Sequence, residues 1–381
     1  MSFNGMIEIN NARKDAEYST NKINQKSPLV EIFSHMSAGK NVSELNGKLH
    51  DSEGKVVNSV DEGVAYIREL ARQAGGGNGY AVTELNELRT FTIWPLLQEE
   101  LKLLSWMGNY TALGYNESIL AKTSKLVGDK SRFQALSGDV VFPIWDYDSY
   151  HVSPISISGG YQVDYRKIQL GDMSDENIGM EQVRVDIRNK AAQYVIWKIY
   201  NSLQTATGVK FISATATVTK TALDDMIRNI RRFGSVGISG DYAVVSQING
   251  FAGYQGVNPN VLGISEAAME EIRKTGLLGM YSGCIVKEIS NGFDMTKPLP
   301  ANNGWRTLFP EGLLFVIPNG KESPVRSWTR GGLTSFTGNS VETGRVLTRF
   351  DLEVACDVEK GSEYKIGLIH DTMYSLVDPM A

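Results

Sequence analysis

The chain has 381 residues, and its 43 acidic and 38 basic side chains give a net charge of −5. Hydrophobic residues make up 42% of the chain and charged residues 21%, a balance that excludes wholesale disorder. The acidic balance argues against a protein held together by nucleic-acid phosphates. The longest aliphatic run, Leu313 to Ile317, is far shorter than the roughly 20 residues of a membrane helix. With no secretory signal at the N-terminus, the chain is predicted to be soluble and intracellular.

The first sixty residues are polar and lack sustained apolar periodicity. Such a segment cannot bury enough apolar surface to offset its ordering entropy, so residues 1–60 are predicted to be an arm that orders only against something else. A helical lead-in over residues 61–135 is expected next. Its first helix is predicted from a capping box, Ser59 with Glu62, and ends at the glycines of 75–77.

Residues 136–170 alternate apolar and polar side chains on both sides of a polar, aromatic tip. The glycines at 159 and 160 interrupt this alternation. The pattern predicts an extended two-stranded loop, which is marginally stable alone and should lie on another surface.

An apolar stripe from Met180 to Ile199 predicts the longest helix, which ends by Gly208. Helices and strands then alternate, so the fold class is predicted to be α+β. The later elements are a helix over 221–233 and strands over 242–246, 313–317, 352–358 and 364–369.

Motifs for catalysis are nearly absent. The glycine-rich run Gly75 to Gly79 invites a phosphate-loop interpretation, but it follows a helix and no Lys-Ser/Thr pair closes it, which favours a helix cap and hinge. Histidines are scattered singly and no Cys-x-x-Cys occurs, so we expect no metal site and no cofactor. The chain is predicted not to be an enzyme.

One basic cluster, Arg228, Arg231 and Arg232, falls on one face of the predicted helix over 221–233. It is either a solvated face or a subunit contact in which arginine forks meet a neighbour's carboxylates. Nucleic-acid binding ranks third, because three arginines make a weak basic footprint in an acidic chain.

The order of these elements resembles that of the major capsid proteins of tailed phages, which share the Hong-Kong-97 fold. The resemblance covers about 270 residues, from roughly 110 to 381. The segments that carry it are an extended loop at 140–170, a spine helix at 180–207, a helix and strand at 221–246, a central strand at 313–318 and a late strand at 349–358.

The resemblance implies a peripheral domain with the long spine helix, formed by residues 171–210 and 341–361. It implies an axial domain formed by residues 211–340 and 362–381. The chain would be a coat subunit that self-assembles into pentamers and hexamers of an icosahedral shell, and this shell would enclose packaged double-stranded DNA. The subunit would be part of the virion capsid, which would assemble in the host bacterial cytoplasm.

Further expectations follow for the partners. Besides other copies of itself, the subunit would have a portal as a partner. The segment before Ser59 is short and rich in Asn, so no large internal scaffold is expected, which implies a separate scaffolding protein or assembly on the arm alone. The subunit would contact DNA on the inner face without sequence specificity, and it would contact no membrane. Residues 133–166 contain no lysine, which argues against covalent cross-linking through the loop. The expected inter-subunit contacts, besides the three arginines, are aromatic: Trp145, Tyr147, Tyr150 and Tyr161.

Two alternatives remain. An encapsulin-type shell would share the fold, although about 110 residues precede the matched region, where encapsulins have a much shorter start. A nucleotide-binding enzyme would grip a phosphate with the Gly75–Gly79 loop and would lose affinity on replacing Gly77 and Gly79.

Overall fold

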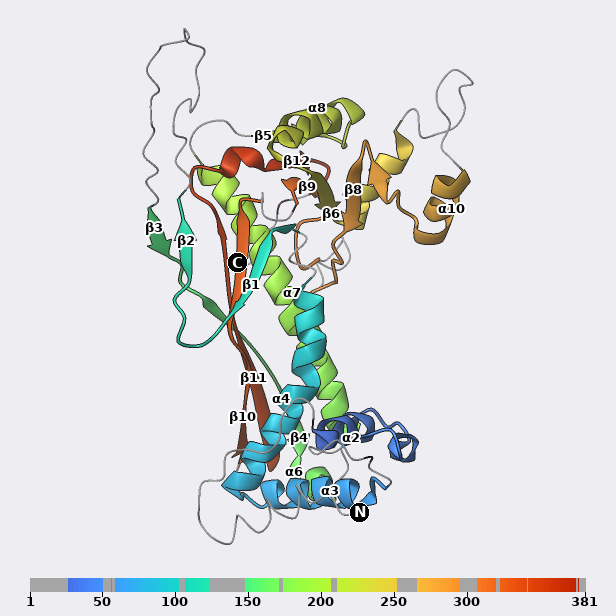
Figure 1. Ribbon diagram of the computed structural model, residues 1–381, viewed down its shortest axis with the longest axis vertical. Coiled ribbons are helices and arrows are strands. Elements are labelled where there is room, and N and C mark those ends of the chain that lie inside the picture. Colours follow the sequence, from blue (N-terminus) through green and yellow to red (C-terminus); the bar gives the residue numbers. More distant parts are fainter. Residues whose placement is uncertain are drawn as a thin grey trace, which may run out of the picture. The chain divides into compact units, whose positions relative to one another are not determined.

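The computed structural model describes residues 27–50, 56, 59–102, 107–123, 148–170, 174–206, 211–251, 266–294, 307–319, 323–340, 342–374 and 376 (Figure 1). The chain forms two compact units, each assembled from three separate segments. Unit 1 consists of Met1–Leu101, Ser156–Arg188 and Gly331–Glu353, and unit 2 of Lys102–Ile155, Asn189–Arg330 and Val354–Ala381. This division differs from the expected domains, because the lead-in helices and residues 331–340 belong to unit 1.

Unit 1 begins with a short helix where an arm was expected. Helix α2 (Pro28–Ser37) has a proline in its first turn and packs on the next two helices through Ile32 and Phe33, which are completely buried. The prediction of an arm is therefore wrong for this segment, and residues 1–26 lie outside the described residues. A 3-10 turn, η1 (Val42–Leu45), follows, and Asn41 caps it through a hydrogen bond from the Ser43 N–H.

Helices α3 (Asp61–Gly75) and α4 (Gly79–Leu101) confirm the helical lead-in as far as residue 101. The predicted capping box does not form, because the hydroxyl of Ser59 accepts from the Asp61 N–H. Pro95 lies inside α4. Beyond α4 the segment up to residue 123 contributes strands, so the expectation of a helical lead-in to residue 135 is wrong there.

The long predicted helix is confirmed as α7 (Ser174–Thr205), 32 residues that run from unit 1 into unit 2. It is preceded by a short helix, α6 (Tyr165–Leu170). Its buried side chains recur at helical spacing, which is the stripe seen in the sequence; they are Met180, Val183, Ile187, Ala191, Val195, Ile199 and Leu203.

A four-stranded sheet has the order β1-β10-β11-β4. Its strands are β1 (Asn109–Leu113), β10 (Val325–Ser340), β11 (Arg345–Val358) and β4 (Ile155–Asp164). Strand β4 was expected to form half of the extended loop. It is instead an edge strand of this sheet, so the predicted limits 136–170 are wrong.

Part of the expected loop does pair, but as a different pair of strands, β2 (Leu120–Lys122) and β3 (Ser149–His151), which lie antiparallel in unit 2 (Figure 1). Residues 124–147 between them lie outside the described residues. The lysine-free range 133–166 falls partly on these residues, so the expectation that no cross-link forms through the loop stays a prediction.

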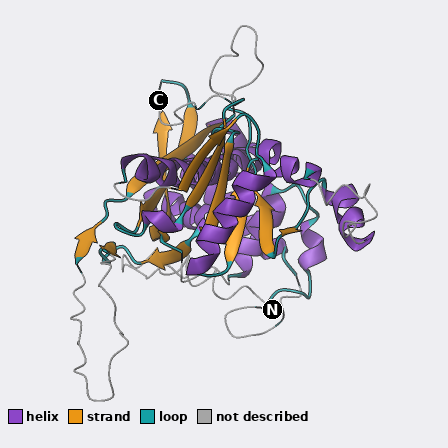
Figure 2. Ribbon diagram, turned by 90° about the horizontal axis from the view of Figure 1, so that it is seen from above, coloured by secondary structure: helices purple, strands orange, loops and turns teal. Residues whose placement is uncertain are grey.

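Unit 2 is built around a six-stranded sheet of order β5-β12-β9-β6-β8-β7, whose strands are orange in Figure 2. Strand β9 (Leu313–Pro318) lies in its interior with every residue buried, as its apolar sequence predicts. The other strands are β5 (Phe211–Thr215), β6 (Val236–Gly240), β7 (Met280–Tyr281), β8 (Cys284–Glu288) and β12 (Gly367–Asp371).

Helix α8 (Lys220–Ile230) packs on β9 and β12 through Leu223, Met226, Ile227 and Ile230. Thr219 caps this helix by accepting a hydrogen bond from the Ala222 N–H. A strand expected at 242–246 is wrong. Those residues form helix α9 (Tyr242–Val245) and the start of η3 (Ser246–Gly250), and the strand is β6 just before them. The remaining short elements of the unit are η2 (Arg231–Phe233), α10 (Glu266–Thr275) and η5 (Glu363–Lys365).

None of the helices in the described part of the chain is long and apolar enough to cross a membrane.

Candidate functional site

The glycine-rich run between α3 and α4 is a helix terminus in which the amides of residues 76–78 donate to carbonyls of α3. The N–H of Gly77 donates to Ala74 and that of Asn78 donates to Gln73, the pair of bonds that defines a Schellman motif. Gly77 adopts a φ of +86°, the left-handed conformation this motif requires. The helix-cap part of the interpretation is therefore confirmed, whereas a hinge stays a prediction, and the amides of residues 76–78 already donate to the carbonyls of α3.

Metal-binding residues do not gather either. Over the ranges that the structure describes, no group of three His, Cys, Asp or Glu side chains is placed to hold a metal ion. Both cysteines are free and buried, and burial raises the pKa of each thiol.

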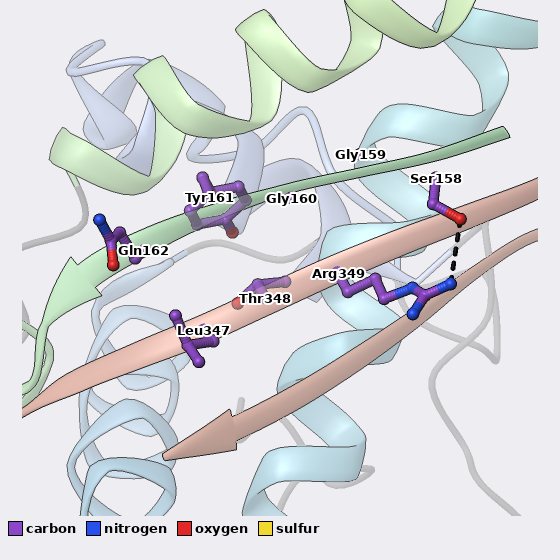
Figure 3. A pocket seen from close by; sticks show the side chains of 8 residues that line it. All are labelled: Ser158, Gly159, Gly160, Tyr161, Gln162, Leu347, Thr348 and Arg349. Atoms are coloured by element: carbon purple, nitrogen blue, oxygen red, sulfur yellow. Dashed lines mark hydrogen bonds between the residues drawn. The ribbon is translucent and has the colours of Figure 1, made fainter. Parts of the chain in front are cut away.

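In unit 1, strands β4 and β11 form a shallow groove of about 570 Å³ on the sheet (Figure 3). The Arg349 guanidinium crosses it to donate to the Ser158 hydroxyl at 3.0 Å and also donates to Asp351 at 2.8 Å. Gly160 contributes no side chain to it, because a Cβ there would come within 2.8 Å of the Thr348 carbonyl oxygen. The lining residues are Ser158, Gly159, Gly160, Tyr161, Gln162, Leu347, Thr348 and Arg349.

Two large apolar side chains accompany the groove. Leu347 is 45% exposed on β11 and Phe336 is 59% exposed on the adjacent strand β10. Exposed and buried side chains alternate along β11, as expected for a strand with one covered face. The buried residues on either side of Leu347 and Arg349 are Val346, Thr348 and Phe350. The residues that line the groove include hydroxyl groups but no carboxylate, histidine or lysine that could act as their base. Exposed apolar groups beside a charged side chain suit a protein contact.

A buried polar network lies beneath the same sheet. Arg89 of α4 and Glu176 of α7 form an ion pair with both side chains fully shielded from solvent. The Arg89 guanidinium also donates at 3.0 Å to Asn86 and to Thr337 of β10. Burial is the largest influence on Arg89 and opposes its charge, but its neighbours, Glu176 foremost, act against burial, and the net effect is a raised pKa of the guanidinium. The network fixes two helices and a strand of unit 1.

Tyr161 belongs to this buried side of the sheet. Its ring stacks on Phe350 with centroids 6.1 Å apart, and it lies against Gly179, where a Cβ would come within 2.5 Å of its Cγ. Burial, followed by the charge of Glu176, raises the pKa of its hydroxyl. Tyr161 is thus partly buried within its own subunit, and its expected contact with a second subunit stays a prediction.

Tyr150 lies on β3 in unit 2, half-buried. Its hydroxyl donates to the Asp357 carboxylate, and the Lys360 ammonium lies 4.1 Å from the centre of its ring. Trp145 and Tyr147 lie outside the described residues, and their expected role in subunit contacts stays a prediction.

The three arginines of the basic cluster have different surroundings. Arg228 pairs with Asp225 at 2.9 Å, and Arg231 donates at 3.2 Å to the Ser282 carbonyl in the turn between β7 and β8. Arg232 is exposed and has no hydrogen bond or ion pair to any described residue. A subunit contact through these arginines stays a prediction, with Arg232 the side chain most available for it.

The sequence matches a family model over residues 9–370, nearly its whole length, and that model describes the SPbeta prophage-derived putative capsid protein YonB. The chain belongs to the YonB family. No curated protein matches this YonB-family chain in sequence.

Solved structures similar to this YonB-family chain include chains from phages and from an encapsulin complex. The chain from "The head structure of Helicobacter pylori bacteriophage KHP40" is 10% identical, with 70% of this chain and 88% of that chain covered and a TM-score of 0.46. A chain of Mycobacterium phage Che8 is 9% identical, with coverage of 67% and 84% and a TM-score of 0.41. A chain of the SrpI encapsulin complex from Synechococcus elongatus is 10% identical, with coverage of 69% and 84% and a TM-score of 0.40.

Proposed function

We propose that this chain is the major capsid subunit of a tailed phage or prophage, with a Hong-Kong-97-like fold, and that it assembles into pentamers and hexamers of an icosahedral shell. The observation that carries the proposal is the family match over residues 9–370. The long helix α7, the paired strands at the base of the extended loop and the mixed sheet of unit 2 agree with the arrangement that the sequence resemblance implies.

The role is structural and not catalytic. The Gly75–Gly79 run is a helix terminus in which the amides of residues 76–78 donate to α3, which weakens the support for the nucleotide-binding alternative. Neither the groove on β4 and β11 nor the network around Arg89 combines a nucleophile with a base.

The principal partner is a second copy of the same chain. Phe336 and Leu347 expose apolar surface on adjacent strands, as subunits that form obligate contacts do. A separate scaffolding protein and a portal would complete the assembly. Packaged double-stranded DNA would lie on the inner face without sequence-specific contacts, in a virion capsid assembled in the host cytoplasm.

Electron microscopy of the purified chain, beside light scattering after size exclusion, tests this function. Closed shells, or free pentamers and hexamers, are expected either alone or on co-expression with a scaffolding protein. Nuclease-resistant double-stranded DNA inside particles made in infected or induced cells is expected for a phage capsid, and shells filled with protein cargo instead would indicate an encapsulin-type compartment. A chain that stays monomeric with every candidate scaffold would contradict the proposal.

A further inference from the structure

The ribbon formed by β2 and β3 has one face fully committed to its own subunit. Ile119 and Ala121 are buried in a small cluster with Trp328 of β10 and Ala355 of β11. Tyr150 and Val152 from the other strand pack against the same cluster. The cluster belongs to unit 2 and is separate from the core around α8.

The opposite face of the ribbon is open to solvent. Leu120 and Lys122 on β2, and Ser149 and His151 on β3, alternate with the inward residues and are all exposed. The ribbon therefore has an inner face that is occupied and an outer face that is available to a partner.

Two strands of three residues are marginally stable as an isolated ribbon. Only three residue pairs form the ladder, and single backbone hydrogen bonds extend it at each end, from Thr123 N–H to Asp148 at 2.8 Å and from Val152 N–H to Ile119 at 3.0 Å. The orientation of the ribbon thus depends on what fastens its inner face.

The strongest fastening is at Tyr150. A hydroxyl that donates to a carboxylate makes a charge-assisted hydrogen bond, about twice as strong as a neutral one, and a lysine ammonium over an aromatic ring adds a cation–π attraction. Burial, followed by the Asp357 carboxylate, raises the pKa of Tyr150, and the nearby Glu359 acts in the same direction. The hydroxyl therefore keeps its proton and remains the donor at any physiological pH.

We propose that Tyr150, Asp357 and Lys360 form a latch that holds the β2–β3 ribbon in one orientation on β10 and β11 of its own subunit, so that its outer face meets a second copy of the chain at a constant angle. This assigns Tyr150 as a positioning residue and not as a direct subunit contact. The inference rests on the proposed function only for its second part, because the latch itself is a property of the single subunit.

Hydrogen exchange on the full-length chain, at concentrations too low for assembly, tests the latch. Tyr150→Phe keeps the ring on its apolar cluster and removes only the hydroxyl. We expect the amides of Thr123 and Val152 to exchange at least tenfold faster in this variant, while the amides of β9 keep their protection. The matched control is Tyr115→Phe, which removes a hydroxyl from a half-exposed tyrosine in the same stretch and should change neither rate.

A double-mutant comparison separates the latch from a general loss of packing. If Tyr150 and Asp357 act through one hydrogen bond, removing both partners should have no larger effect than removing one. The ribbon amides of the double variant Tyr150→Phe with Asp357→Asn should then exchange no faster than those of whichever single variant exchanges faster. Two results would overturn the latch. One is an unchanged amide exchange rate in Tyr150→Phe; the other is a double variant whose increase in exchange rate equals the product of the increases in the two single variants.

Assembly provides the second, independent measurement. Shells or capsomers of Tyr150→Phe should show a wider spread of diameters by electron microscopy than those of the unsubstituted chain and of Tyr115→Phe. If the Tyr150→Phe amides exchange faster but its shells are as uniform as those of the unsubstituted chain, the latch within the subunit is supported. Its role in setting the angle of contact between subunits is then overturned. Failure of the unsubstituted chain to assemble would count against the proposed function alone, since the exchange measurement does not require shells.

Discussion

Arg89 and Glu176, which lie 87 positions apart in the sequence, form an ion pair from which solvent is completely excluded. The pair connects α4 to the first turns of α7. The additional hydrogen bonds from Arg89 to Asn86 and Thr337 provide acceptors for most of the remaining N–H donors of the guanidinium. Removing one partner from such a pair leaves an uncompensated buried charge, which costs more than the pair itself contributes.

We therefore expect Arg89→Met to lower the free energy of unfolding by about 3–5 kcal/mol, as measured by urea denaturation. The double substitution Arg89→Met with Glu176→Leu should recover part of that loss, because no unpaired charge remains. The matched control is the exposed pair of Arg72 and Glu69, for which Arg72→Met should lower the free energy of unfolding far less, because solvent screens both charges. Equal losses for Arg89→Met and the double variant would show that the pair is not what stabilises this region.

Glu87 of α4 should make stability depend on pH. Burial, and then the nearby charge of Glu84, raises its pKa from the ordinary value of 4.5 to about 7. Because the folded-state pKa is the higher one, the folded state binds the proton more tightly, and the associated stability is complete below the unfolded-state pKa and is lost as pH rises through about 7. Denaturation from pH 4 to pH 8 should show this decline in the unsubstituted chain and less of it in Glu87→Gln. Parallel curves for the two proteins would contradict the assignment.

Gly77 should tolerate no side chain, for a conformational reason. Its φ of +86° is left-handed, which costs a residue with a Cβ about 1–2 kcal/mol. Gly77→Ala should therefore lower the melting temperature, whereas Gly79→Ala, at the first position of α4 with no atom within 4 Å of its Cβ, should leave it unchanged or raise it. Equal effects of the two substitutions would contradict this account of the turn.

The exposed surface of the unit 1 sheet should matter for assembly and not for folding. Leu347→Glu places a charge on a side chain that is already half-exposed, so the free energy of unfolding of the isolated subunit should change by less than about 0.5 kcal/mol. Assembly, followed by sedimentation of shells, should be strongly reduced if this surface meets another copy. Leu96→Glu, at a similarly exposed leucine of α4, is the control, and shells that form equally well from both variants would remove this surface from the contacts.

The parts of the fold that sequence patterns predict are those whose burial is regular along the chain. Helix α7 and strand β9 carry a continuous apolar stripe and a continuous apolar run, and both lie where these patterns indicate. Strand β6 was misplaced because it is built of small residues. At Gly240 a Cβ would come within 2.7 Å of the Leu313 carbonyl oxygen, so close packing against β9 demands a residue that normally signals a break.

Strand β4 shows a second limit. Its alternating pattern correctly indicates a strand, but its partner is β11, about 190 residues later, and local patterning does not specify which strand pairs with which. Gly159 does not interrupt the strand as expected; a Cβ there would come within 3.0 Å of a methyl group of Val183, so the glycine allows α7 to lie close. The pairing of Arg89 with Glu176 has no local signal at all, and neither does the contact of Tyr150 with Asp357, because each joins distant segments.

Strand β12 lies between β5 and β9 in the interior of the unit 2 sheet. Strand β5 pairs in this sheet only with β12, whose residues come about 150 positions later in the sequence. The two segments must therefore fold together before this side of the sheet is complete, and a chain cut before residue 367 would leave the backbone groups of β5 and of one edge of β9 without their partners.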